Sequence, residues 1–76
     1  MPAPFSPSGM HNIHVTIVSP EEAADGTAEF WSGGRMVGFT HLEDGDLMLR
    51  LEAGVVVGAH SLAEAIAEAN RLLAVY

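Results

Sequence analysis

The chain has 76 residues, a length that suits a single domain, and its ten acidic and three basic residues give a formal net charge of −7. A domain of this size hides only about 60% of the surface of its unfolded chain, so we expect marginal stability or support from a partner. The acidic balance argues against nucleic-acid binding by this chain alone, and it suits a basic protein partner or simply solubility.

The composition excludes further classes of site. Cysteine is absent, so disulfides, thiolate metal sites and cysteine nucleophiles are excluded. A hydrophobic fraction of 49% is high for so small a domain and favours self-association. No apolar run is long enough to span a membrane and the N-terminus does not resemble a signal peptide, so we expect a cytoplasmic protein without a membrane partner. The lack of lysine and the many alanines are typical of high-GC bacteria.

Residues 1–10 are predicted to form a flexible N-terminal tail, and residues 11–76 a single α+β domain. Three of the four prolines lie within the first nine residues, where they disfavour both helix and strand. Two interpretations of the tail stay open: a loose extension, with Met10 as the natural start, or an arm that docks on a neighbouring molecule through Phe5.

Residues 11–19 alternate in polarity, which predicts a half-buried strand. The buried face of this strand would carry Ile13, Val15 and Ile17. A short helix over about residues 20–25 should follow, because Ser19 can cap it, Pro20 suits its first position and Glu22 can close a capping box.

A hairpin is predicted around Gly33-Gly34, because two glycines supply the positive φ angles of a two-residue turn. This turn sets Trp31 opposite Met36 and fixes the register of both strands. The face predicted to be buried carries Ala28, Phe30, Val37 and Phe39. The opposite face would carry Glu29, Trp31, Met36, Gly38 and Thr40.

The second turn contains Glu43, Asp44 and Gly45. A two-residue Asp-Gly turn would place Phe39 opposite Arg50 and mix core with charge. A three-residue loop, with Gly45 in the left-handed conformation and a bulge, would place Phe39 opposite Leu49 instead. The agreement of the apolar faces favours the three-residue loop.

The C-terminal part predicts a short fourth meander strand at residues 55–57 and then a helix over residues 61–76. Ser61 is the expected N-cap, and Glu64 lies three residues later as in a capping box. The apolar stripe of this helix is predicted to contain Leu62, Ile66, Ala69, Leu72, Leu73 and Tyr76. The expected fold is an antiparallel β-meander of four to five strands, with one C-terminal helix packed on one face.

Gly58, Ser61, Leu62, Glu64 and Ala65 form a strand-to-helix junction that resembles the C-terminal end of HicB-type antitoxins. The resemblance covers little more than the last twenty residues, and it implies a dimeric module that neutralises a partner and has no catalytic residues. The chain departs from the family pattern in two ways: it lacks the Pro-x-x-Pro-Gly-Cys-like segment before the junction, and no DNA-binding extension follows.

The four histidines do not predict a metal site. His11 and His14 would point to opposite faces of one strand, and no spacing requires His41 or His60 to meet Asp44 or Asp46. The ordered ligand series of an EF-hand and the glycine patterns of phosphate-binding loops are both missing. We therefore predict no catalytic residues, no metal and no cofactor.

The sheet face away from the C-terminal helix is the predicted contact surface, since an exposed tryptophan among methionines is typical of an interface. Its predicted interface residues are Trp31, Met36, Thr40, Met48 and Arg50. A homodimer that buries Trp31 is the favoured interpretation, and cover by the N-terminal segment is the alternative. The predicted function is a small non-enzymatic protein-interaction module that self-associates and regulates or neutralises a basic protein. The alternative is a small-molecule-binding accessory protein that uses the Trp31 face or the cleft between sheet and helix.

Overall fold

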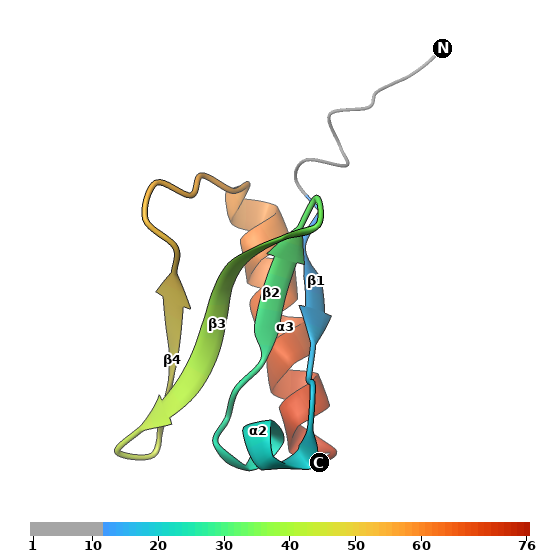
Figure 1. Ribbon diagram of the computed structural model, residues 1–76, viewed down its shortest axis with the longest axis vertical. Helices are drawn as coiled ribbons and strands as arrows, with labels where there is room; N and C mark the ends of the chain where they lie inside the picture. The colour runs from blue at the N-terminus through green and yellow to red at the C-terminus, as the bar shows by residue number, and fades with distance from the viewer. Residues whose placement is uncertain (1–11) are drawn as a thin grey trace.

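A computed structural model describes residues 12–76, so the predicted tail at residues 1–10 lies outside the described part. The elements in chain order are β1 (His14–Thr16), α2 (Pro20–Ala24), β2 (Glu29–Ser32), β3 (Arg35–Glu43), β4 (Asp46–Leu51) and α3 (Ala59–Ala74). The four strands form one antiparallel sheet in the order β1-β2-β3-β4 (Figure 1). The predicted α+β meander with a C-terminal helix is confirmed.

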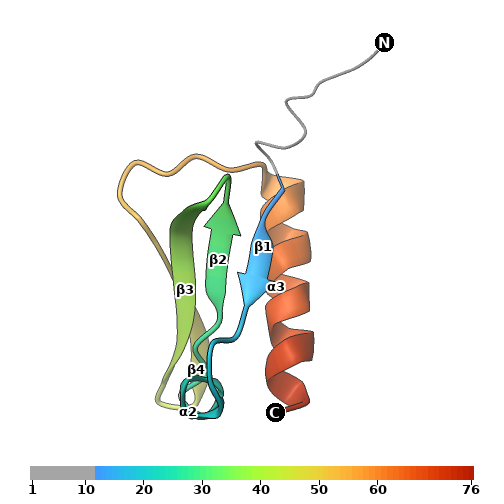
Figure 2. The ribbon, with the colours of Figure 1, turned by 45° about the vertical axis from the view of Figure 1, so that its right-hand side comes forward.

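The long helix α3 covers one face of the sheet, and it covers that face unevenly. Figures 1 and 2 show α3 alongside β1 and β2, whereas β4 lies at the far side of the sheet. The buried apolar residues within residues 12–76 are Ala28, Phe30, Val37, Ala65 and Ala69. The partly buried residues that pack against them are Ile13, Val15, Ile17, Leu49, Val55, Leu62 and Leu73.

The helix faces the sheet through small residues. Ala65 and Ala69 are four apart, so they lie on one side of α3, and both are buried. The predicted stripe is therefore only partly right, because Ile66 and Tyr76 are exposed while Ala65, which was not predicted, is central. Alanines allow a close approach of helix and sheet, so the helix turns its smallest residues towards the sheet.

The first hairpin begins as predicted and then departs from the predicted register. Ser32 pairs with Arg35 and Trp31 with Met36 around the Gly33-Gly34 turn, where both glycines have positive φ. A β-bulge follows, and Phe30 pairs with Gly38 instead of Val37.

The bulge inserts Val37 as an extra residue in β3 and reverses the faces beyond it. Val37 and Gly38 both stay on the core side, Thr40 becomes buried and Phe39 pairs with Arg50. The predictions that Phe39 is in the core and Thr40 on the outer face are therefore wrong. Glycine is required at position 38, since a Cβ there would lie 2.7 Å from the backbone oxygen of Arg50.

The second turn is the two-residue turn that the sequence argument disfavoured. Glu43 pairs with Asp46, so only Asp44 and Gly45 form the loop, with φ of 53° and 85°. Positive φ at both positions is typical of a type I′ hairpin turn. The predicted three-residue loop is wrong because the bulge has already exchanged the faces of β3, and the two-residue turn then aligns Thr40 with Leu49 on the core side.

The hydroxyl of Thr40 ties β3 to the loop between α2 and β2. It accepts a hydrogen bond from the backbone N–H of Ala28 at 2.9 Å and donates one to the carbonyl of Gly26 at 2.6 Å. The backbone N–H of Thr40 also donates to the carbonyl of Ala28. A polar side chain is thus tolerated in the core because each of its bonds satisfies a backbone group.

Helices α2 and α3 begin differently. Ser19 caps α2, and its Oγ accepts a hydrogen bond from the N–H of Glu22 at 3.2 Å, as predicted. Helix α3 begins at Ala59 with Gly58 as the N-cap and has no side-chain cap bond. Ser61 therefore lies inside the first turn, and its predicted capping role is wrong. Residues 55–57, predicted as a strand, are part of the connecting loop.

These caps predict different effects for two serine substitutions. Ser19→Ala should lower the free energy of unfolding by about 1 kcal/mol, because an orphan N–H loses its acceptor. Ser61→Ala should change it by less than about 0.5 kcal/mol, because alanine suits a helix interior. Urea unfolding followed by circular dichroism measures both. A larger loss for Ser61→Ala than for Ser19→Ala would place the start of α3 at Ser61 after all.

Candidate interaction surfaces

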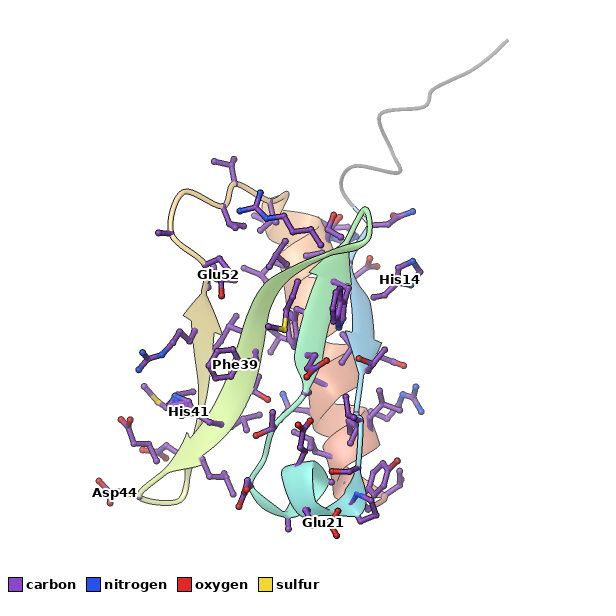
Figure 3. The ribbon with its side chains drawn as sticks, viewed as in Figure 1. His14, Glu21, Phe39, His41, Asp44 and Glu52 are labelled. Carbon is purple, nitrogen blue, oxygen red and sulfur yellow. The ribbon has the colours of Figure 1, made fainter. Side chains whose placement is uncertain are left out.

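The outer face of the sheet is the side away from α3. Its side chains, set by the observed register, are Glu29, Trp31, Met36, Phe39, His41, Met48 and Arg50. Figure 3 shows Phe39 and His41 on β3, and their ring centroids are 6.1 Å apart. Phe39 was not predicted on this face, since only the bulge brings it there.

Trp31 is less exposed than the sequence suggested. Trp31 and Met36 form a cross-strand pair and both are half-buried. The indole Nε1 of Trp31 donates a hydrogen bond to Oε1 of Glu29 at 3.2 Å. Gly38, which was predicted on this face, lies on the core side instead, against Leu51.

The five predicted interface residues do not share one surface. Met48 and Arg50 are exposed on β4, and Trp31 and Met36 are half-buried on the outer face. Thr40 is only 2% exposed and lies in the core, so its assignment to the interface is wrong. The physical reason is the bulge, which turns the side chain of Thr40 towards α3.

A second apolar surface lies on the core side of the sheet, between β4 and the adjacent side of α3. We call it the β4 surface, and its residues are Leu42, Leu47, Leu49, Leu51 and Ile66. Leu42 is 48% exposed, Leu51 39% and Ile66 37%. A depression of about 250 Å³ lies between β4 and α3 within it. The residues that line the depression are Thr40, Leu47, Met48, Leu49, Ile66, Ala69 and Asn70.

The β4 surface was not predicted from the sequence. The sequence placed Leu49 on the buried side of the sheet, and Leu49 does lie on the side that faces the helix. What the sequence could not show is that α3 lies alongside β1 and β2, away from β4, and leaves Leu42 and Leu51 exposed (Figure 1).

The outer edge of β4 is open: no strand pairs with it within residues 12–76. A two-residue hairpin closes on a hydrogen-bonded pair, here Glu43 and Asp46, so alternate residues of β4 from Asp46 onwards bond to β3. The backbone groups that point to the open edge therefore belong to Leu47, Leu49 and Leu51. Unpaired edges of this kind are templates for pairing with another chain.

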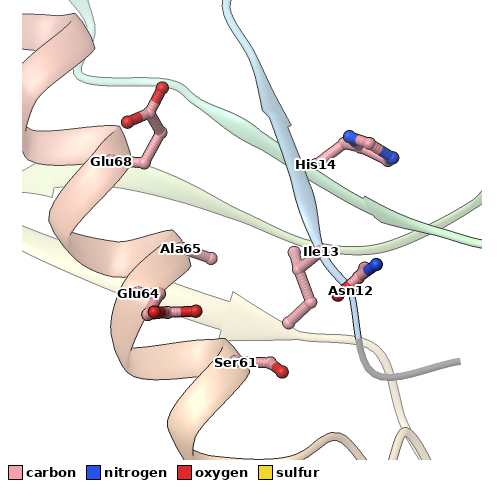
Figure 4. Close-up of a pocket in the computed structure, with 7 residues that line it drawn as sticks. All are labelled: Asn12, Ile13, His14, Ser61, Glu64, Ala65 and Glu68. Carbon is pink, nitrogen blue, oxygen red and sulfur yellow. The ribbon is translucent and has the colours of Figure 1, made fainter. Parts of the chain in front are cut away.

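A polar cleft of about 330 Å³ lies between β1 and the first half of α3 (Figure 4). The residues that line it are Asn12, Ile13, His14, Ser61, Glu64, Ala65 and Glu68. Figure 4 shows His14 extending away from α3. Both carboxylates already have partners on the helix: Oε2 of Glu64 lies 3.3 Å from Nε2 of His60, and Glu68 binds Arg71.

Glu68 and Arg71 form an ion pair on α3. Hydrogen bonds from Arg71 to the Glu68 carboxylate, together with its negative charge, raise the pKa of Arg71. This pair is exposed and three residues apart on α3, so it is an ordinary surface ion pair.

Across residues 12–76, no three His, Cys, Asp or Glu side chains are placed to hold a metal ion together. No described helix has the length and apolar character of a membrane span. His60 contacts Glu64 on its own helix, and His41 contacts Phe39.

Comparison with known proteins finds no relative of this chain. No protein-family model matches the chain, and neither the curated proteins nor the solved structures contain a significant match. The resemblance to HicB-type antitoxins thus rests on the junction at Gly58 to Ala65 alone.

Proposed function

We propose that this chain is a small non-enzymatic protein-interaction module that self-associates through β4. The observation that carries the proposal is the open edge of β4, bordered by the exposed apolar side chains of Leu42, Leu51 and Ile66. Pairing of two β4 edges would satisfy their unpaired backbone N–H and C=O groups. The apolar side chains beside the edge would be buried in the same contact.

The small core supports the proposal energetically. In the described part of the chain, three of the five buried apolar residues are alanines, and Phe30 is the largest of the five side chains. Complete burial of one leucine or isoleucine side chain contributes about 1.5–3 kcal/mol. Leu42, Leu51 and Ile66 are 37–48% exposed, so covering them would add about 2–4 kcal/mol per chain, a large fraction of the lower end of domain stabilities, about 5 kcal/mol. A second copy is the simplest cover, because a twofold contact uses the same surface on both subunits.

A basic protein is the proposed further partner. The chain has a net charge of −7, and the exposed turn with Glu43, Asp44 and Asp46 connects β3 to β4. An acidic surface attracts a basic partner and speeds the encounter at low salt. Regulation or neutralisation of such a partner is the role that the HicB-like junction would imply.

A small-molecule-binding role is the second candidate, and its support is the polar cleft between β1 and α3. The volume of the cleft, about 330 Å³, lies within the usual range of small-molecule pockets. Its two carboxylates, however, are already paired with His60 and Arg71. The interaction module therefore has the stronger support.

Self-association predicts a specific response in sedimentation equilibrium. Wild type should sediment as a dimer at high micromolar concentration, and Leu51→Glu should shift it to the monomer because a charge is placed in the contact. Val18→Glu is the matched control: Val18 is also exposed, but it lies between β1 and α2, so this variant should remain dimeric.

Trp31→Glu separates the two candidate surfaces. If β4 forms the contact, this variant should remain dimeric. Dissociation of Trp31→Glu together with an intact Leu51→Glu dimer would move the contact to the outer face. A monomeric wild type would contradict self-association altogether.

A further inference from the structure

The two faces of β4 differ in chemistry. Leu47, Leu49 and Leu51 lie on the core side, whereas Asp46, Met48 and Arg50 lie on the outer side. Asp46 and Arg50 are both exposed, and neither has an ion-pair partner within the part of the chain that the structure describes. The strand therefore presents one free negative and one free positive charge, four residues apart on the same side.

Backbone geometry limits how two copies of β4 can pair. In an antiparallel pair, residues that bond across the new edge must both point to it, and these are Leu47, Leu49 and Leu51. The twofold axis then passes through a single residue position of β4. An axis at Met48 and an axis at Leu49 each pair five residues of β4 with five of the other copy.

Charge decides between these two axes. An axis at Leu49 places Asp46 opposite Glu52 of the partner subunit, which juxtaposes like charges. An axis at Met48 places Asp46 opposite Arg50 of the partner subunit, and the symmetry repeats this attraction. The same axis sets Leu47 opposite Leu49 of the partner subunit on the core side, so the apolar surfaces become continuous.

We infer that two copies of this chain pair their β4 strands antiparallel about a twofold axis at Met48, with reciprocal contacts between Asp46 and Arg50. The inference rests on the proposed self-association and adds its register. The result is an eight-stranded sheet, since β4 is the last strand of each four-stranded sheet. In the dimer, Met48 faces its own copy across the axis.

Charge-reversal variants, measured by sedimentation equilibrium, test the proposed contacts between Asp46 and Arg50. Asp46→Arg and Arg50→Asp should each raise the dimer dissociation constant at least about tenfold, because each creates two like-charge contacts. An equimolar mixture of the two variants, and the double variant on one chain, should both regain the wild-type constant. The two substitutions change the net charge by two in opposite directions, so a general charge effect would move the constants in opposite directions.

A cysteine cross-link tests the position of the axis independently. The sequence contains no cysteine, so an introduced cysteine can form a disulfide only with its own copy in the partner subunit. Non-hydrogen-bonded antiparallel partners have Cα atoms about 4.5 Å apart, which is within the range of about 4.4–6.8 Å that disulfides span. Met48→Cys should therefore form a disulfide-linked dimer on mild oxidation. Arg50→Cys is the control, because its two copies would be about 13 Å apart and should stay largely unlinked.

The outcomes separate the inference from the proposed function. A monomeric wild type would overturn both. A dimer that tightens with Asp46→Arg, or that cross-links through Arg50→Cys rather than Met48→Cys, would overturn the Met48 axis and leave self-association standing. A dimer indifferent to every charge reversal and to both cysteines would place the contact away from β4.

Discussion

Phe30→Ala should lower the free energy of unfolding by about 3–5 kcal/mol, the largest effect expected of a single substitution here. Phe30 is 0% exposed, and its neighbours in the core include Ala28, Ala65 and Ala69. Alanines cannot move into the space that the phenyl ring leaves, so the cavity should persist. Urea unfolding measures the loss, and much of the stability of so small a domain should disappear.

Phe39→Ala is the matched control for Phe30→Ala. The sequence predicted both rings in the core, but the bulge places Phe39 on the outer face beside His41. Its loss should cost only about 1 kcal/mol, because the ring is half-exposed. Equal losses for the two variants would contradict the bulge. Both should be compared at one low protein concentration, since self-association adds to apparent stability.

Thr40→Val should destabilise the protein by about 2–4 kcal/mol, although valine has nearly the same shape and is more apolar. The substitution removes the acceptor for the N–H of Ala28 and the donor to the carbonyl of Gly26. Both backbone groups would then be buried without a partner, which costs more than the added methyl group contributes. Urea unfolding measures this loss as well.

Thr40→Ser is the control that keeps the hydroxyl. It should lose only the contribution of one buried methyl group, about 1 kcal/mol, and should stay more stable than Thr40→Val. If valine instead stabilised the protein, the hydroxyl would lie on the outer face, as the sequence argument had placed it.

The small core of the domain gives the β4 surface a role in stability as well as in assembly. A domain whose core consists largely of alanine and one phenylalanine gains by covering its exposed leucines. The substitutions that test the contact, at Asp46, Arg50 and Leu51, all lie at exposed positions outside this core. Their effects on assembly can therefore be separated from effects on folding.

Local chemistry in the sequence determined the class of fold and several of its parts. The alternation around Val15, the Gly33-Gly34 turn and the Ser19 cap each depend on neighbouring residues, and the structure confirms each of them. The C-terminal helix was also predictable from its alanines and leucines, although it begins two residues earlier than expected.

Tertiary structure alone decided which residues face the core and which surface stays open. A bulge adds one residue to a strand without ending the strand. Because side chains alternate between the two faces of a sheet, each residue beyond the bulge then points to the opposite face from the one expected. That single insertion at Val37 moved Phe39 outwards, buried Thr40 and made the two-residue turn at Asp44 the consistent one. The position of α3 over β1 and β2 depends on how Ala65 and Ala69 pack against the sheet, and this long-range contact leaves Leu42 and Leu51 exposed.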